Sequence, residues 1–274
     1  MVMSSYSSVA DVIKKKTKYH TSRLILAGTL VFSAGVNIAH AADIPTLTAG
    51  STPSSRPACF LDITTGKFEG FMPEIASEVA RRAGFKITFN AIPFSALLQS
   101  LLTNKIDMIV AGMSPTAQRK TKVDFSEDVT SLGEGIFVRN DNKKQYKTAQ
   151  DFKGEVIGIM AGADYGPRIA AMHVAKEVKF YESPADLARD VQLGRISVGI
   201  NDYPIIKGEA AAGSLKGMHV VESYQPTQVD PIAFAFRKGN EPLLLKVNKA
   251  IDSMKADGSL QKILNKWGMK YYAG

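Results

Sequence analysis

The sequence contains one cysteine, Cys59, and one tryptophan among its 274 residues. An exported chain with a single cysteine has no internal disulfide, so it depends on a hydrophobic core for its stability. Cys59 precedes Phe60, and we interpret it as a small buried apolar residue rather than a reactive thiol.

The common motifs of hydrolases, metalloenzymes and nucleotide-binding proteins are missing. There is no G-x-S-x-G elbow, no H-E-x-x-H pair and no cluster of histidine and cysteine. His173 and His219 stand apart from any metal-ligand partner, and Gly158 and Gly162 lack the spacing of a nucleotide-binding loop. We therefore expect no catalytic residue, no metal and no cofactor.

Long apolar runs and basic tracts are absent from the sequence after residue 41. No stretch there approaches the roughly 20 apolar residues of a membrane helix. No tract of lysine and arginine with interleaved aromatic residues points to nucleic acid, so we expect no nucleic-acid partner.

Residues 1–41 have the pattern of a secretory signal peptide. Five basic residues between Lys14 and Arg23 precede an apolar run over 24–36, and the small-x-small triplet 39–41 follows. The mature chain is expected to begin at Ala42. Removing five basic residues and one acid lowers the formal charge by four, from +8 to +4, so any preference for small anions or zwitterions is weak.

The rest of the chain alternates apolar strands with amphipathic helices. Its 45% hydrophobic content suits a globular protein with two domains of ordinary size. The expected strands cover residues 44–49, 85–91, 106–111, 135–139, 156–160, 179–181, 197–200 and 232–236. The expected helices cover 72–83, 94–102, 165–175, a segment from Ser183 to about Gly194, and two helices in 241–267 broken at Asp257-Gly258. This order predicts α/β units with mostly parallel sheets, and the apolar stripe of the last helices is expected to pack on the first unit.

The stretch 106–126 joins a buried strand to a polar turn and an arginine. Gly112 allows a tight turn, and Ser114-Pro115 has the pattern of a helix N-cap followed by the first helical residue. Arg119 then follows about one turn into that helix, so amides, hydroxyl and guanidinium could face one small anion. The alternative is that Arg119 is a solvated helix residue beside two lysines.

Further polar and aromatic residues follow other predicted strands, where parallel sheets collect ligand groups. They are Thr52, Ser55, Arg56, Phe94, Ala163, Asp164 and Asp202. With Arg119 for a carboxylate, an acid for an ammonium and an aromatic ring to stack, the set describes an amino-acid zwitterion. Each also has a structural alternative: Phe94 as core, Asp202 as a cap of the next turn, and Asp164 as an ordinary helix-start acid.

Five segments of the mature chain resemble the polar amino-acid-binding proteins of bacterial ABC importers, the type II periplasmic solute-binding family. They are GKFEGFMPEIASEVARRAG, IPFSALLQSLLTNKIDMIVAGMSPTAQRKTKVDFS, DFKGEVIGIMAG, FAFRKGN and LLLKVNKAIDSMKADGSLQKILNKWG. The resemblance implies two lobes, each a mostly parallel sheet flanked by helices, joined by two crossover strands that form a hinge. The implied division is 1–41 signal peptide, 42–138 lobe 1, 139–232 lobe 2, and 233–274 returning to lobe 1.

The resemblance also assigns roles to the candidate residues. Arg119 would grip the ligand α-carboxylate, and the backbone at Gly112 and Ser114 would bind the ammonium or the carboxylate. Phe94 would stack on the ligand, and Asp202 stands where the family places its ammonium-binding aspartate. The turn at Ala163 and Asp164 would close over the carboxylate.

The chain departs from the family pattern at the ligand loops. Thr52 and Ser55 stand where an acid and an aromatic are usual, and Arg56 takes a place often held by proline. Ala163 replaces a customary threonine or serine, which removes one hydroxyl donor, and Asp164 follows it. The extra arginine beside a lost aromatic suggests a smaller or additionally anionic ligand, unless Arg56 points to solvent.

The resemblance therefore predicts a periplasmic receptor, monomeric and without enzymatic activity, that delivers an amino acid or a similar small ligand to ABC permease subunits. The alternative is an exported enzyme on the same scaffold, resembling cyclohexadienyl dehydratases, with Asp164 or Glu134 as general acid. The sensor domain of a membrane receptor is disfavoured because no second membrane segment precedes Gly274.

Overall fold

The computed structural model describes residues 44–269, which belong to one compact unit. The signal peptide expected at 1–41 lies outside the described residues. The helices are α1 (Phe71–Ala83), α2 (Phe94–Leu102), α3 (Ala117–Lys120), α4 (Tyr165–Ala171), α5 (Pro184–Gln192), α6 (Tyr203–Ala211), α7 (Glu241–Ala256) and α8 (Ser259–Lys266), with a 3-10 turn at Ala149–Phe152.

The main sheet runs in the order β10-β9-β11-β8-β13-β6-β1-β5, with β12 beside β8 and β7 beside β13. Its strands are β1 (Thr46–Ser51), β5 (Lys86–Ala91), β6 (Met108–Met113), β7 (Val123–Phe125), β8 (Thr130–Arg139), β9 (Val156–Met160), β10 (Glu177–Tyr181), β11 (Val198–Asp202), β12 (Met218–Val220) and β13 (Val229–Arg237). The strand pairs at both ends of the sheet are parallel, whereas β8 and β13 in its middle pair antiparallel with their neighbouring strands.

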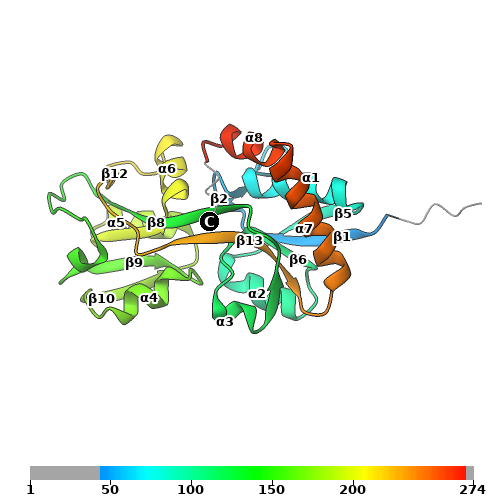
Figure 1. The fold of residues 1–274 in the computed structure, drawn as a ribbon. Helices are drawn as coiled ribbons and strands as arrows, with labels where there is room; N and C mark the ends of the chain where they lie inside the picture. The colour runs from blue at the N-terminus through cyan, green and yellow to red at the C-terminus, as the bar shows by residue number, and fades with distance from the viewer. Residues whose placement is uncertain (1–43, 270–274) are drawn as a thin grey trace, which may run out of the picture. The chain divides into compact units, whose positions relative to one another are not determined.

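Strands β8 and β13 each change partners along their length. Val229–Ile232 of β13 pairs with the first residues of β8, and the following residues pair with β6 and β7. Strand β8 leaves β13 after Gly133 and pairs with β11 from Glu134 onward. These are the two crossover strands that the resemblance implied, and Figure 1 shows them running side by side between the two groups of helices.

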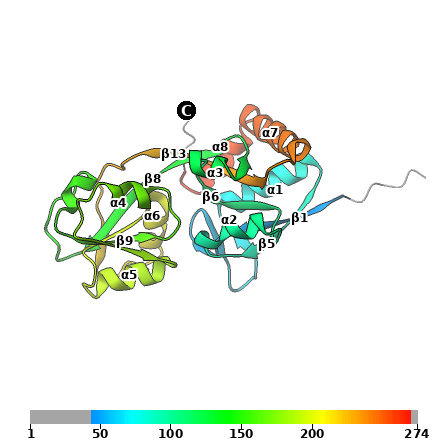
Figure 2. The ribbon, with the colours of Figure 1, turned by 90° about the horizontal axis from the view of Figure 1, so that it is seen from below.

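Three clusters of buried side chains fill the two ends of this sheet, one at the first end and two at the second. The first core takes apolar residues from β1, β6, α1, α2, α7 and α8. The second lies on both faces of β8, β9 and β11: Ile136 packs on one face and Phe137 on the other, as strand geometry requires. We call the surroundings of these cores the first and second lobes. Figure 2 shows α4 and α5 on opposite sides of the second lobe's strands.

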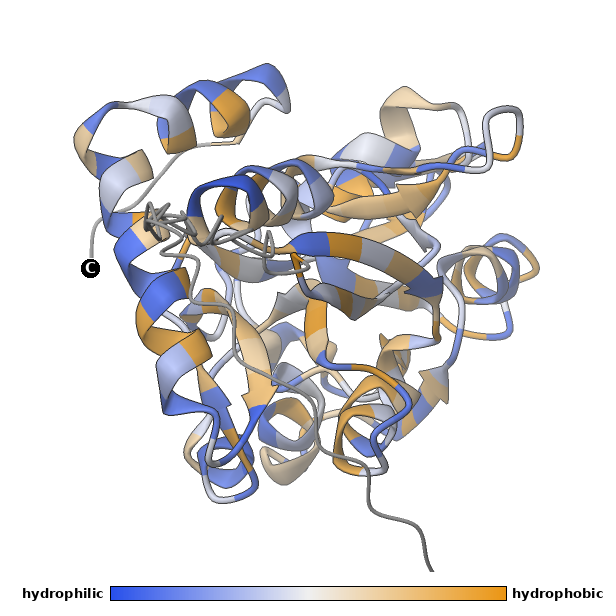
Figure 3. Cartoon of the chain, turned by 90° about the vertical axis from the view of Figure 1, so that its right-hand side faces the viewer, coloured by the Kyte–Doolittle hydropathy of each residue, from blue (hydrophilic) through white to orange (hydrophobic). Residues whose placement is uncertain are grey.

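The predicted α/β fold of the type II binding proteins is confirmed, down to several helix ends. Gly84 ends α1 in the left-handed conformation, and Asp257-Gly258 separates α7 from α8. The stripe of Val247, Ala250 and Met254 is buried, and α7 and α8 contact α1. In Figure 3 the central strands are mostly hydrophobic while the helices alternate, which is the pattern of elements that cover a sheet.

Several local predictions were wrong. No strand was predicted between residues 50 and 70, but this segment carries a small antiparallel sheet of β2 (Ser54–Ser55), β3 (Cys59–Leu61) and β4 (Phe68–Glu69). Helix α4 ends at Ala171 rather than 175, because His173 takes a positive φ of 53°. Helix α6 was missed, because the residues after Asp202 were expected to form only a turn, although Pro204 stands in a first helical turn, where proline is favoured.

Candidate functional site

The turn that carries Arg119 differs from the prediction. Strand β6 continues to Met113, and the helix begins only at Ala117. Thr116, not Ser114, is its N-cap, and its hydroxyl accepts a bond of 3.2 Å from the Arg119 amide. Ser114 does not cap because the helix begins three residues further along the chain. The four-residue helix is also too short to supply the helix-terminus anion site that we expected.

The guanidinium of Arg119 lies between the two lobes. It donates to the carbonyl of Ser114 in its own lobe and to the carbonyl of Gly162 in the second lobe, each at 2.8 Å. Its central carbon lies 5.8 Å from the centre of the Phe94 ring, within the range of a cation–π contact. Burial lowers the Arg119 pKa, while the charges of Asp164, Asp202 and Asp230 oppose that shift. The alternative of a solvated arginine is therefore wrong.

Asp202 ends strand β11 in the second lobe, within electrostatic reach of Arg119. Although it precedes helix α6, its side chain makes no capping hydrogen bond, so the capping alternative is also wrong. Burial, together with the nearby carboxylates of Asp164 and Glu134, raises the Asp202 pKa from 3.8 to about 7, although Arg119 opposes this shift. The same carboxylate acts on the buried thiol of Cys59 across the lobes.

Asp164 stands at the N-terminus of α4 without capping it. Its Oδ2 is buried and has no hydrogen-bond partner among the described residues. Burial raises the pKa of Asp230, and the adjacent Asp164 carboxyl group raises it further. Arg168 donates to Asp230 at 3.3 Å. Ala163 packs beside the second core and offers no hydroxyl.

The first loop contributes less than expected. Thr52 is buried, and its hydroxyl has no hydrogen-bond partner within residues 44–269. Ser55 pairs with Cys59 in the small sheet. Arg56 is exposed, and its guanidinium lies 3.6 Å from the centre of the Phe60 ring, where its charge acts on Asp62. The hint of an additionally anionic ligand therefore gains no support from the position of Arg56.

Two residues near Asp202 were not predicted as ligand residues. Glu134 faces Asp202 across β8 and β11, and Tyr165 opens α4 with its hydroxyl influenced by both carboxylates. A glutamate inside the apolar run 132–138 is a signal that sequence reasoning could have used, because a buried acid needs partners. Tyr165 carries no such signal.

Further contacts join the lobes. Ser95 of α2 donates to Glu182 at 2.5 Å, and a Cβ added to Gly162 would lie 3.1 Å from the Cα of Ser95. Gly112 has a φ of +65° but lies inside strand β6, so the tight turn that the sequence predicted at this glycine was wrong. The structure thus brings together Arg119, Phe94, Ser114, Asp164 and Asp202, and leaves Arg56 elsewhere.

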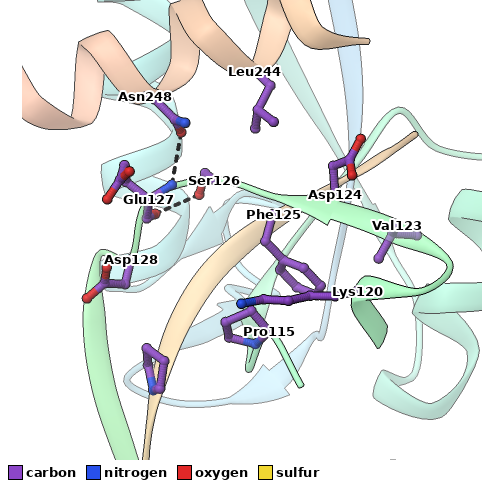
Figure 4. Close-up of a pocket in the computed structure, with 11 residues that line it drawn as sticks. Pro115, Lys120, Val123, Asp124, Phe125, Ser126, Glu127, Asp128, Leu244 and Asn248 are labelled. Carbon is purple, nitrogen blue, oxygen red and sulfur yellow. Dashed lines mark hydrogen bonds between the residues drawn. The ribbon is translucent and has the colours of Figure 1, made fainter. Parts of the chain in front are cut away.

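A cavity of about 430 Å³ lies elsewhere, between α3, β7 and α7. Figure 4 shows its lining, where Asn248 accepts from the Glu127 amide and the Ser126 hydroxyl donates to the Glu127 carbonyl. None of the ten predicted ligand residues lines it. Among residues 44–269 there is no group of histidine, cysteine and acids suited to a metal, and no helix there is long and apolar enough to cross a membrane.

An arginine from one lobe faces an aspartate from the other, and two crossover strands join the lobes, which together define a two-lobed binding protein of the type II class. The chain belongs to the bacterial extracellular solute-binding proteins, family 3, whose sequence profile matches residues 47–270. It is a solute-binding protein of the ABC-transporter type, and membership of this family implies an extracytoplasmic location.

Relatives with similar sequences and structures are named as amino-acid-binding proteins. The probable amino-acid-binding protein YxeM of Bacillus subtilis is 28% identical, covering 92% of this chain and 96% of its own. The L-cystine-binding protein TcyJ of Escherichia coli is 29% identical, covering 74% and 75%. An ancestral arginine-binding protein, solved with glutamine and with arginine bound, is 30% identical with a TM-score of 0.75, covering 81% of this chain and 97% of its own.

Proposed function

We propose that this protein captures an amino acid, or a similar small zwitterion or anion, between its two lobes and delivers it to permease subunits of an ABC importer. The observation that carries the proposal is the position of Arg119 between the lobes. Its guanidinium donates a hydrogen bond to Gly162 of the second lobe, and it lies close enough to Asp202 of that lobe for each group to shift the pKa of the other. Opposite charges held on two movable lobes suit a ligand with one carboxylate and one ammonium.

Each site residue then takes one role. Arg119 holds the α-carboxylate in exchange for one of its carbonyl contacts, helped by the backbone at Gly112, Ser114 and Ala163. Phe94 stacks on the ligand, and Asp202 accepts from the ammonium.

We propose that lobe 1 comprises 42–138 with 233–274 and lobe 2 comprises 139–232, so β8 and β13 lie at the hinge. The protein acts as a monomer in the periplasm, where each closure traps one ligand. Catalysis forms no part of this proposal, and an assay with prephenate is expected to show no turnover. Turnover would favour the dehydratase-like alternative.

A thermal-shift screen of amino acids on the chain from Ala42 tests the proposal. A ligand that binds only the folded state raises the free energy of unfolding by about 2.7 kcal/mol at a hundred times its Kd. The melting temperature therefore rises with ligand concentration. We expect a concentration-dependent rise with a small group of amino acids. No rise with any amino acid would contradict the proposal.

A further inference from the structure

The second lobe places two buried acids directly opposite each other. Asp202 and Glu134 are register partners in the antiparallel pair β11–β8, so their side chains leave the same face of the sheet. Glu134 is 1% exposed. Like charges opposite each other destabilise a sheet unless a cation lies between or beside them. The buried pair of Glu134 and Asp202 therefore needs a positively charged group beside it.

The positive groups of the chain do not balance this region. Three carboxylates, those of Glu134, Asp164 and Asp230, lie within electrostatic reach of the Asp202 carboxylate, which makes four acids in this region. Two guanidiniums accompany them: Arg119, which lies between the lobes, and Arg168, which pairs with Asp230. A zwitterionic ligand adds no net charge, so it would leave the formal excess of two negative charges in place.

Unsatisfied polar atoms mark where the missing cation belongs. Within the described part of the chain, Oε2 of Glu134, Oδ2 of Asp164 and the hydroxyl of Tyr165 are all buried without a hydrogen-bond partner. The other oxygen of Glu134 is satisfied, because it accepts from the Tyr224 hydroxyl at 3.2 Å and from the Thr227 amide. Tyr165 is 3% exposed and lies within electrostatic reach of Glu134, Asp164 and Asp202. Buried polar atoms seldom remain unpaired, so a ligand group is expected among them.

We propose that the ligand is a cationic amino acid whose side-chain ammonium or guanidinium is held by Glu134, Asp164 and Tyr165, while Asp202 accepts from its α-ammonium. All three unsatisfied atoms can accept hydrogen bonds, and an ammonium has three N–H donors while a guanidinium has five. The inference rests on the proposed function and assigns its substrate class.

Matched ligand pairs test this inference by isothermal titration calorimetry on the chain from Ala42 at pH 8. L-arginine against L-citrulline, and L-lysine against L-norleucine, compare a cationic side chain with a neutral one of similar size. We expect at least one cationic ligand to bind tenfold or more tightly than its neutral counterpart. If neutral amino acids bind as well as the cationic ones, the inference is overturned while the proposed function stands. If no amino acid binds, both fail.

Single substitutions test whether Glu134 and Asp164 hold the cationic side chain of the ligand. Glu134→Gln and Asp164→Asn keep shape but remove one charge each, and Asp252→Asn removes an exposed acid on α7 as a control. In the first two variants we expect affinity for the cationic ligand to fall tenfold or more, with a change of less than about threefold for its neutral counterpart. The control should match the wild type. Equal losses for both ligands of a pair would assign these acids a structural role and overturn the inference.

Discussion

The guanidinium of Arg119 donates to the carbonyl of Gly162 across the two lobes, with an N–O distance of 2.8 Å. The other donor nitrogen contacts Ser114 of the same lobe. The residue proposed to bind the ligand carboxylate therefore also links the lobes, so ligand capture and lobe closure depend on the same side chain.

Replacing Arg119 with alanine is expected to weaken amino-acid binding at least tenfold. A hydrogen bond to a charged group is worth about 1.5–3 kcal/mol, and 1.4 kcal/mol corresponds to a factor of ten in affinity. Calorimetry checks this, with Lys120→Ala as the control because Lys120 is an exposed cation on the same short helix. Equal losses in both variants would indicate a general charge effect instead of a specific contact.

Adding a methyl group at Gly162 should hinder closure without unfolding either lobe. Its Cβ would lie 3.1 Å from the Cα of Ser95, which is backbone of the opposite lobe and cannot rotate away. Gly162→Ala also places alanine at a φ of +82°, which costs roughly 1–2 kcal/mol. We expect calorimetry to show at least tenfold weaker binding.

Gly66→Ala is the matched control for that prediction. Gly66 has a φ of +68°, but a Cβ there would meet no atom of the described chain within 4 Å. It should lose similar stability in a thermal melt and keep its ligand affinity. Wild-type affinity in Gly162→Ala would show that the lobes do not need this close approach.

Ligand affinity should rise with pH between 6 and 8. The ligand ammonium prefers ionised Asp202, whose pKa is raised to about 7 by burial and by the nearby acids Asp164, Glu134 and Asp230, with Arg119 opposing. At pH 6 only about a tenth of the Asp202 groups are ionised, so affinity should be about tenfold weaker than at pH 8. Tyr165 and Cys59 also face this carboxylate, but burial keeps both pKa values far above this window.

The stability of the unliganded protein should change in the opposite direction. The unfolded chain ionises Asp202 near pH 3.8, whereas the folded protein holds its proton up to about pH 7. The folded state thus binds more protons in this window, and its stability falls as pH rises from 4 to 7. Asp202→Asn should remove this part of the pH dependence in thermal melts and lower ligand affinity. If melting temperature and ligand affinity depend on pH in Asp202→Asn as they do in the wild type, the raised pKa does not belong to Asp202.

The C-terminal helices should loosen when Arg82 is replaced. Arg82 of α1 bonds Asp257 at 2.7 Å and the hydroxyls of Ser253 and Ser259 at 2.8 Å each. It therefore holds α7 and α8 against α1. Arg82→Met is expected to lower the melting temperature at pH 7. Arg81→Met is the control because Arg81, with a side chain 69% exposed, bonds Glu78 and no other residue within 44–269.

Acid should weaken the same region. Hydrogen bonds from Arg81 and Arg82 hold the Glu78 pKa at about 2, and those from Ser259 and Arg82 hold the Asp257 pKa at about 2. Both acids stabilise the fold above their ordinary pKa values of 4.5 and 3.8, and this stability is lost as pH falls toward 2. The melting temperature should drop over that range, and the drop should be smaller in Arg82→Met. An equal drop would assign the acid sensitivity to other carboxylates.

The fold was predictable because local patterns and global arrangement agree. The buried stripe of α7, the glycine after α1 and the apolar run of β6 each have one physical interpretation. Six of the eight expected strands lie within about two residues of their expected positions, whereas β8 and β13 begin five and three residues earlier than expected, and β7 and β12 were missed. The small sheet around Ser55 was missed, because its strands of two and three residues are set by contacts rather than by local sequence pattern.

The candidate site was predictable only in part. Arg119 and Asp202 follow buried strands, so the sequence places them at sheet ends where ligands bind. The register that sets Glu134 opposite Asp202 depends on the pairing of strands far apart in sequence. No local pattern fixes that pairing. The contact between Arg56 and Phe60 likewise arises from the folding of a loop.

The most direct test of the account is a calorimetric titration, at pH 8, of the amino acid that gives the largest thermal shift. It would be titrated into the wild type, Arg119→Ala and Asp202→Asn. We expect saturable one-to-one binding to the wild type and binding at least tenfold weaker in each variant, because both lobes hold the same molecule. Wild-type affinity in either variant would contradict it.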